Sequence, residues 1–332
     1  MPVRAQLGQI LGSIVSHFPK LQILSLPTFA ECMPTLSESS SFIHLRSFIF
    51  DGSSSIVAGK NPSISLILSF LQHIPHLENM WMKHPINPDP EAHPFGKTSS
   101  EITNRKDSEP PIVLRYLTRL ALMVPGACSA ILSCIEAPAL CDLHLHGTLV
   151  PSFYEGGDPI WPCWSNRVVM NALKAFAWRP SSLHRLAITE LYFANKELDW
   201  LLFGDGRGAP FPQLESLALH YSSFGFSDRF LLRCSQQQTA VSLRRLALLN
   251  CSSPRLTSSA IVCAITSPFN GLRKAGGFEL ELDDTAPQFT ENELGALAAI
   301  GVKLIRWSDG ERWKSGGQKL HDWIDPCDSY AY

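Results

Sequence analysis

A short pattern of leucine-like residues, written L-x-x-L-x-L, recurs along the chain and limits the folds that it can adopt. Its clearest copy runs from Leu243 to Leu248. Leu246 and Leu248 alternate there with other residues, which predicts a short strand that buries one row of side chains and exposes the other. Leu243 stands three residues earlier and is expected to point into the same core. Because leucine is common, one copy says little, and the interpretation depends on recurrence.

Related copies follow one another along most of the chain, and several alternate with stretches that have apolar residues at helical spacing. A unit of one strand and one helix cannot bury both apolar faces alone, whereas stacked units bury them continuously. We therefore predict an α/β leucine-rich-repeat solenoid, a horseshoe with parallel strands on its concave side and helices outside. The copies begin at Leu21, Leu45, Leu77, Leu117, Leu140, Leu183, Leu214 and Leu243, and a less regular one includes Phe278.

Irregular segments divide the predicted repeats. We predict that the solenoid covers residues 1–307, with insertions at 84–111 and 147–166, and that residues 308–332 form an irregular cap or tail. Six prolines stand among small and charged residues in the first insertion, which is typical of a tolerated surface insertion. A binding or regulatory loop is the alternative for that segment.

One segment fits two structures. Leu173-x-x-Phe176-x-Trp178 matches the strand pattern, but the apolar spacing before it also fits a helix. We predict a helix, because the next copy begins too soon afterwards, at Leu183, for two separate repeats. Further helices are predicted at 64–71, 130–135, 198–202 and 230–234, and after the capping-box sequence Thr290-x-x-Glu293.

Composition excludes several classes of protein. Hydrophobic residues make up 45% of the chain and charged residues 17%, which is typical of a folded domain. The formal net charge of −2 gives no overall attraction to nucleic acid or to an anionic membrane. No apolar run reaches the length of a membrane span, and no secretory signal is evident at the N-terminus. We predict a soluble cytoplasmic or nuclear protein that binds neither nucleic acid nor membrane.

Motifs for catalysis are absent from the sequence. It contains no G-x-S-x-G, no H-E-x-x-H and no G-x-G-x-x-G after a strand, so we predict a non-enzyme without a cofactor. The nine cysteines are dispersed and include no C-x-x-C pair, which argues against a disulfide framework and a zinc site. Asp142, His144 and His146 would share one strand face and could bind a metal, but three exposed polar residues are the favoured interpretation.

An acidic run without intervening Lys or Arg occurs near the C-terminal end of the predicted repeats. A solvated edge is the favoured interpretation, and a site for a cation or a basic partner is the alternative. The run contains Glu279, Glu281, Asp283, Asp284, Glu291 and Glu293.

The side chains that alternate with the buried row should form one exposed face. Charged residues, an exposed aromatic residue and histidines suit protein recognition, in which Trp and Arg often anchor binding. Thr189 and Ser216 share this face. The predicted partner-binding residues are Asn79, Trp81, Lys83, Arg119, Asp142, His144, His146, Arg185, His220 and Arg245.

The C-terminal half resembles the leucine-rich-repeat region of fungal F-box-like proteins. The resemblance is carried by the segments 182–189, 196–202, 211–219, 243–251 and 257–261. It implies a substrate-binding region of a ubiquitin-ligase receptor, whose F-box docks on the adaptor of a cullin-type ligase. The L-P-x-E run of an F-box is not found before Leu21. An adaptor is therefore expected as a partner only if an F-box lies upstream. A free-standing scaffold, or a regulatory or immune-receptor-type fragment, is the alternative.

Overall fold

The structure is a computed structural model. It describes residues 20–26, 40–51, 64–83, 110–123, 127–146, 163–177, 179, 182–189, 195–204, 210–220, 227–236, 243–249, 256–267 and 277–307. The predictions for 84–109, 147–162 and 308–332 lie outside these residues.

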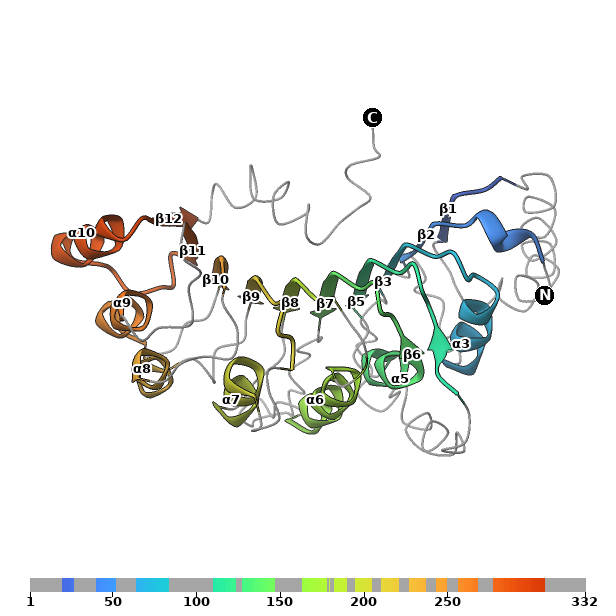
Figure 1. Cartoon of the computed structure of the whole chain (residues 1–332), viewed down its shortest axis with the longest axis horizontal. Helices are drawn as coiled ribbons and strands as arrows, with labels where there is room; N and C mark the ends of the chain where they lie inside the picture. The colour runs from blue at the N-terminus through green and yellow to red at the C-terminus, as the bar shows by residue number, and fades with distance from the viewer. Residues whose placement is uncertain are drawn as a thin grey trace, which may run out of the picture. The chain divides into compact units, whose positions relative to one another are not determined.

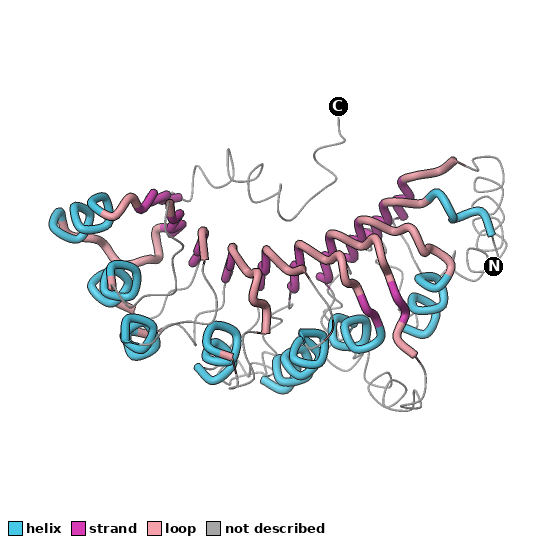
Figure 2. Tube along the Cα trace, in the orientation of Figure 1, coloured by secondary structure: helices cyan, strands magenta, loops and turns pink. Residues whose placement is uncertain are grey.

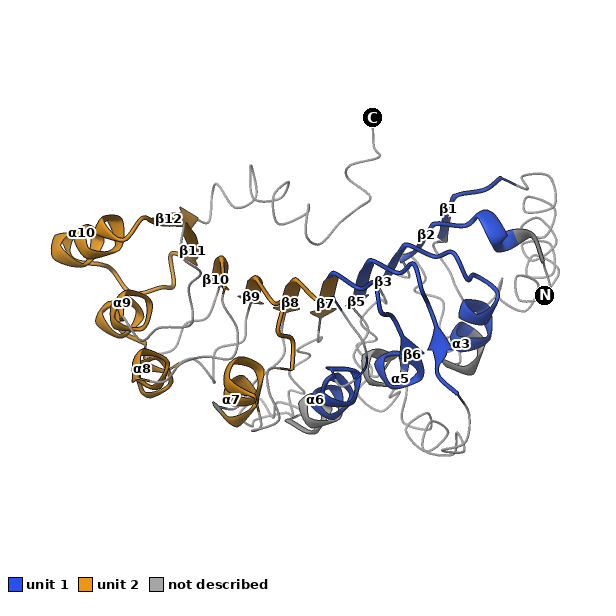
Figure 3. Cartoon of the chain, viewed as in Figure 1, with its two compact units in different colours: residues 1–141, 146–182 blue, residues 142–145, 183–332 orange. Residues whose placement is uncertain are grey.

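In the part of the chain that the structure describes, ten parallel strands form the main sheet, and strands that neighbour each other in the sheet also follow one another along the chain. Helices alternate with the strands (Figure 1). This order confirms the predicted parallel α/β arrangement of consecutive strand and helix units. The chain divides into two compact units, residues 1–141 with 146–182 and residues 142–145 with 183–332 (Figure 3).

The first unit contains four strands of the sheet. Each pairs in parallel with the next, so that Leu24 lies beside Phe48, Phe48 beside Met80 and Met80 beside Leu120. The strands are β1 (Ile23–Leu26), β2 (Ser47–Asp51), β3 (Asn79–Lys83) and β5 (Arg119–Met123). The helices are η1 (Ser40–His44), α3 (Ile64–Gln72), α5 (Ala127–Cys134) and α6 (Cys163–Ala177).

The second unit contains the later strands. They are β7 (Asp142–His146), β8 (Arg185–Thr189), β9 (Ser216–His220), β10 (Arg245–Leu249), β11 (Phe278–Asp283) and β12 (Val302–Trp307). The helices are α7 (Asn195–Phe203), α8 (Asp228–Gln236), α9 (Ser258–Thr266) and α10 (Glu291–Ala299). They lie on one side of the strands of this unit, which we call the helix face, and the other side is the open face (Figure 2).

A tight turn explains the first leucine of five of the L-x-x-L-x-L copies. The Leu214 backbone N–H donates to the Phe211 carbonyl three residues earlier, at 3.1 Å, and Leu214 is buried. Leu45, Leu77, Leu117 and Leu140 make the same i to i−3 bond. The turn reverses the chain toward the core, and the extended strand begins two residues later. The pattern therefore encodes a turn and a strand together.

Each turn joins the next strand in the same way. The His184 carbonyl accepts both the Glu215 and Ser216 backbone N–H groups, at 2.9 and 3.0 Å. The Glu215 carbonyl in turn accepts the N–H groups of Arg244 and Arg245. Equivalent bonds link the successive strands of the first unit, starting from the Gln22 carbonyl. Repetition of this contact fixes the register, so equivalent positions of successive strands lie side by side.

The core lies between the strands and the helix face. The second and fourth residues of β8, β9 and β10 and the first, third and fifth residues of β11 point into it, and Leu186, Leu217 and Leu280 have no exposed area. Apolar residues at helical spacing meet them from the other side, as the sequence predicts. In the second unit these include Leu198, Leu201, Leu202, Phe230, Leu231, Ile261 and Ile265.

Helix α6 confirms the choice of helix for the segment with two possible structures, because Leu173 and Phe176 lie buried on it. It begins at Cys163, inside the predicted insertion 147–166, so the end of that predicted insertion is helical. Helix α10 begins with the predicted capping box of Thr290 and Glu293. Within the described residues, no helix is both long and apolar enough to cross a membrane.

A small second sheet was not predicted. It pairs β4 (Ile112–Val113) with β6 (Ile135–Glu136), both in the first unit. Ile135, assigned to a helix from the sequence, is the first residue of β6 because α5 ends at Cys134. Arg179 closes this helix end, because its guanidinium donates to the Leu132 and Ser133 carbonyls at 3.1 and 2.7 Å and also to that of Ile135.

Candidate functional site

All ten predicted partner-binding residues lie on strands, at the positions that alternate with the buried row. They are Asn79, Trp81 and Lys83 on β3, Arg119 on β5, Asp142, His144 and His146 on β7, Arg185 on β8, His220 on β9 and Arg245 on β10. The side chains of Lys83 and His146 lie outside the described part of the structure.

In the first unit, we call the face of β2, β3 and β5 that carries the residues alternating with the buried row the open face, and Trp81 dominates it. Its register neighbours are Ile49 on β2 and Ala121 on β5, so an apolar row crosses three strands. Trp81 is only 4% exposed, and the prediction of an exposed aromatic residue was wrong, because apolar neighbours flank its indole. Its Nε1 atom is buried without a hydrogen-bond partner. Asn79 and the exposed Arg119 lie side by side in the next row.

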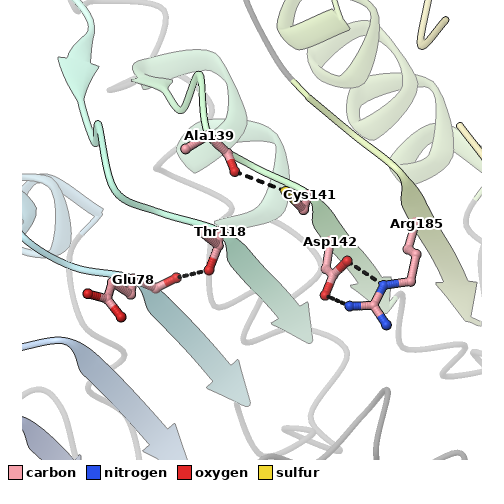
Figure 4. A network of polar contacts seen from close by, with 6 residues as sticks. All are labelled: Glu78, Thr118, Ala139, Cys141, Asp142 and Arg185. Atoms are coloured by element: carbon pink, nitrogen blue, oxygen red, sulfur yellow. Dashed lines mark hydrogen bonds and ion pairs between the residues drawn. The ribbon is translucent and has the colours of Figure 1, made fainter. Parts of the chain in front are cut away.

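In the second unit, one row of the open face runs in register through Arg185, Ser216 and Arg245, and most of its residues are charged. We call it the first row. Arg185 makes a two-point ion pair with Asp142, Nε to Oδ1 and Nη2 to Oδ2 (Figure 4). Ser216 follows in register and is 6% exposed, with its hydroxyl oxygen buried and without a partner. Beyond Arg245, the row ends with the ion pair of Lys303 and Glu279, at 2.7 Å.

The middle row of the same face carries three alanines, then a carboxylate on β11 and Ile305 on β12. Ala187, Ala218 and Ala247 lie side by side on β8, β9 and β10. Glu281 is the register neighbour of Ala247 on β11, and it is 2% exposed. Arg245 pairs with Glu281, at 2.6 Å. The Oε2 atom of Glu281 is buried and has no hydrogen-bond partner.

Of the two histidines in the metal alternative, only His144 has a described side chain. His144 is 4% exposed, and its Nε2 shares a hydrogen bond of 3.0 Å with Thr189 Oγ1, inside the second unit. His220 is the register neighbour of Thr189. Among the described residues, no three His, Cys, Asp or Glu side chains are grouped closely enough to hold a metal ion.

The acidic run is not a solvated edge throughout, and the favoured interpretation was wrong for two of its members. Glu281 and Asp283 are each 2% exposed, although both stand at open-face positions of strand β11. Asp283 Oδ1 accepts the Thr285 hydroxyl at 2.6 Å and the Thr285 N–H at 3.1 Å, which fixes the turn after the strand. Asp284 and Glu291 are exposed, as the sequence predicts.

Glu293, the last member of the run, has a local structural role. Its Oε2 accepts the Thr290 N–H at 2.8 Å and its Oε1 accepts the Ser258 hydroxyl at 3.1 Å. The bond from the Thr290 backbone is the main reason why the pKa of Glu293 lies below its usual range. This carboxylate therefore links the start of α10 to α9.

Glu281 and Ser216 are the residues of this site that sequence reasoning undervalued. Both occupy alternating positions on their strands, so the sequence places them on the open face. Alternation, however, gives the direction of a side chain and not its burial or its partners. The alternation of Phe278, Leu280 and Leu282 was the signal that put Glu281 on the same face as the alanine row.

No protein-family model and no curated protein matches the chain. The fold and this face define the class of protein by architecture: a parallel α/β protein of repeated strand and helix units with an ordered polar face on its strands.

Proposed function

We propose that this chain is a non-catalytic protein-recognition module of the leucine-rich-repeat solenoid type, and that its partner binds the open face of the strands. The observation that carries the proposal is the fixed polar surface of the second unit. There Asp142 holds Arg185 and Glu281 holds Arg245, while both arginines keep exposed surface. Polar groups held in place before binding lose less entropy when a partner docks.

The regular geometry of the strands supports the same proposal. Equivalent positions of β8, β9 and β10 lie side by side, so residues far apart in sequence form continuous rows. Arg185 and Arg245, with side chains 43% and 24% exposed, lie in one such row. Arginine side chains that bury their stems and present a guanidinium are frequent anchors in protein interfaces.

The resemblance of residues 182–261 to fungal F-box-like proteins gives the proposal its cellular setting. We propose that the module binds the substrate of a ubiquitin-ligase receptor. An adaptor of a cullin-type ligase is a partner if an F-box precedes this sequence in the complete protein. A free-standing scaffold or a regulatory fragment would bind its partner through the same face. Binding of the adaptor therefore distinguishes these alternatives, whereas binding at the face does not.

Site-specific photo-crosslinking in cells tests the face. A photoreactive amino acid replaces Ala218 on the open face of the second unit, Arg119 on that of the first, or Arg229 on the exposed side of α8. We expect one protein to be captured through position 218 or 119 and not through position 229. Equal capture through the helix position would overturn the assignment of the face.

Mass spectrometry of the captured complexes tests the setting. If the chain is part of a ligase receptor, full-length protein expressed from its complete transcript should co-purify with a cullin adaptor. Recovery of the face-bound partner without any adaptor would remove the ligase setting and leave a scaffold or regulatory module.

A further inference from the structure

Strand β12 is the last strand of the described sheet and has a free edge (Figure 1). β11 pairs with one side of it, over the six residues from Val302 to Trp307. Among the residues that the structure describes, no strand pairs with its other side. Alternate residues of a strand direct their backbone N–H and C=O groups to opposite sides, so about half of these groups on β12 are open to a further strand.

The apolar layer beneath β12 is also incomplete. Leu304 points to the helix face, as its register neighbour Leu280 does, but Leu280 has no exposed area and Leu304 is partly exposed. Helix α10 buries only Leu297, whereas α9, of the same length, buries five residues. Leu294 on α10 is 42% exposed. An apolar residue placed beside Leu304 would extend the core by one further strand.

The charges on β12 indicate which side chains suit this edge. The strand carries Lys303 and Arg306 and no acidic residue. Lys303 pairs with Glu279 on β11, at 2.7 Å. Among the described residues, Arg306 bonds to neutral oxygens alone, because its Nη2 donates to the Pro287 carbonyl at 2.7 Å and its Nη1 to Gln288 Oε1 at 3.5 Å. An acidic residue on a strand beside Arg306 would add a cross-strand charge pair.

The strand that already pairs with β12 shows a pattern that fits it. β11 has the sequence Phe278-Glu-Leu-Glu-Leu-Asp283, in which apolar residues alternate with acidic ones. Its apolar residues are buried against the helices, and Glu279 stands beside Lys303 on the open face. A strand of the same kind on the free side would meet the same side chains of β12 from the opposite direction.

We propose that the free edge of β12 binds an extended segment of a partner protein that alternates apolar with acidic residues. The backbone of the segment pairs with β12 and adds one strand to the sheet. Its apolar residues cover Leu304, and its acidic residues contact Lys303 and Arg306. This edge is separate from the rows of the open face, so the inference goes beyond the proposed function.

A second copy of the chain fits this edge less well. Pairing of two β12 strands, one from each copy, would bring two lysines and two arginines together without a carboxylate from either strand. Strand β1 ends the sheet on the other side, and its sequence Ile23-Leu-Ser-Leu26 has no acidic residue. Since like charges on facing strands destabilise their pairing, the charge of β12 favours an acidic partner.

Hydrogen exchange measured by NMR on the full chain tests the inference at single residues. The probe is the acetylated and amidated peptide Gly-Phe-Glu-Leu-Glu-Glu-Asp-Gly, which follows β11 and adds an acidic residue beside Arg306. One control peptide carries lysine at every acidic position, and the other carries N-methyl groups that remove its backbone donors. We expect saturable binding of the acidic peptide, at least tenfold slower exchange at alternate amides of β12, and at least tenfold weaker binding of both controls.

Three substitutions complete the test. Arg306→Gln removes the cation and keeps a side-chain donor, and it should weaken binding of the acidic peptide at least fivefold. Lys303→Gln acts at an exposed position, where folding is not at risk, and should weaken binding at least threefold. Arg229→Gln removes the same charge from the exposed side of α8 and should leave binding unchanged within twofold. The amide spectrum of each variant reports whether it is folded.

The inference is overturned if the acidic peptide does not bind, if either control peptide binds equally well, or if the slowed amides lie outside β12. It is also overturned if every β12 amide is protected in the free chain, or if sedimentation shows self-association that Lys303→Gln leaves intact. These results do not decide the proposed function, because partner capture through position 218 tests the open face independently.

Discussion

Arg245 on β10 pairs with Glu281 on β11, although its neighbour in the strand register is Glu279. The pair is diagonal, with 2.6 Å between Nη2 and Oε1, and Glu279 pairs instead with Lys303 on the following strand. The side chain of Glu281 is 3% exposed and that of Glu279 is 39% exposed. Two glutamates on one strand therefore have different environments, and this difference underlies the first prediction.

Arg245→Ala should destabilise the protein strongly. Removal of the guanidinium leaves the Glu281 carboxylate buried without its cation, and loss of one member of a buried ion pair costs about 3–5 kcal/mol. Because Arg245 keeps some contact with solvent, we expect the lower end of that range. Urea unfolding monitored by circular dichroism measures the change in the free energy of unfolding.

Lys303→Ala is the matched control for this prediction. It breaks an ion pair of similar length between register neighbours whose side chains are 66% and 39% exposed, so we expect a loss below about 1 kcal/mol. Equal losses for the two variants would contradict the assignment of Glu281 as a buried, structurally required carboxylate.

Arg179→Ala should destabilise the first unit. The guanidinium donates to the carbonyls of Leu132 and Ser133 in the last turn of helix α5 and to that of Ile135 just after it. Carbonyls in the last turn of a helix have no partner within the helix. We expect a loss of about 2 kcal/mol. Hydrogen exchange should also be faster across α5. Arg179→Lys should recover only part of the loss, because an ammonium lacks the planar fork that reaches several carbonyls.

Arg115→Ala is the control for Arg179, because Arg115 lies exposed in the turn before β5. It should change the free energy of unfolding by less than about 0.5 kcal/mol. If Arg179→Ala were as mild as this control, the role of Arg179 at the end of α5 would be wrong.

Glu293 should make part of the stability dependent on acid. Its pKa is lowered, first by the hydrogen bond from the Thr290 backbone, so the folded state favours the carboxylate. This contribution is present above the usual glutamate range and is lost as the pH falls through the lower folded pKa. The original chain should therefore be more stable than Glu293→Gln near neutral pH, and the difference should shrink toward about pH 3.

Urea unfolding of both chains at several pH values measures this difference, with Glu291→Gln as the control in the same helix turn. A difference between the original chain and Glu293→Gln that stays constant across the acid range would contradict the capping role of the carboxylate.

Cys234 should be unreactive in the folded protein. The pKa of Cys234 is raised to about 12, mainly because the thiol is buried and secondly because of the nearby Asp199 charge. The thiol therefore stays protonated near neutral pH, and the thiolate is the reactive form. The exposed Cys263 on α9 should be alkylated first by iodoacetamide, and Cys234 only on unfolding. Peptide mass spectrometry resolves the two positions.

The same pKa also predicts a loss of stability in alkali. The unfolded chain releases the Cys234 proton at a lower pH than the folded chain, so stability falls as the pH rises above the usual thiol range. Cys234→Ala should have a weaker alkaline dependence. Alkylation of Cys234 as fast as that of Cys263 in the folded state would contradict its burial.

The sequence predicted the arrangement of the elements because their signals are local. The L-x-x-L-x-L copy at Leu214 encodes a turn bond to Phe211 and an alternating strand, and both are visible within nine residues. The same holds for the capping box of Thr290 and Glu293. The two-residue strands β4 and β6 carry no such period, so their pairing was missed.

The sequence predicted the direction in which the side chains of the site point, but not their burial or their partners. Alternation correctly puts Trp81, His144 and Arg245 on the open-face side of their strands. It does not show that Trp81 and His144 are buried, since burial depends on residues far away in sequence. It also does not show that Arg245 turns to Glu281 past its register neighbour, because that choice is made by side-chain rotamers.

The affinity of the purified full chain for its captured protein partner tests the central claim most directly. Ala218→Arg puts a large cation in the middle of the open face of the second unit, and Arg229→Glu changes the exposed side of α8. Biolayer interferometry should show at least a tenfold loss of affinity, about 1.4 kcal/mol, for Ala218→Arg and no change for Arg229→Glu. Unchanged affinity of the folded Ala218→Arg chain, or a loss confined to Arg229→Glu, would contradict recognition through this face.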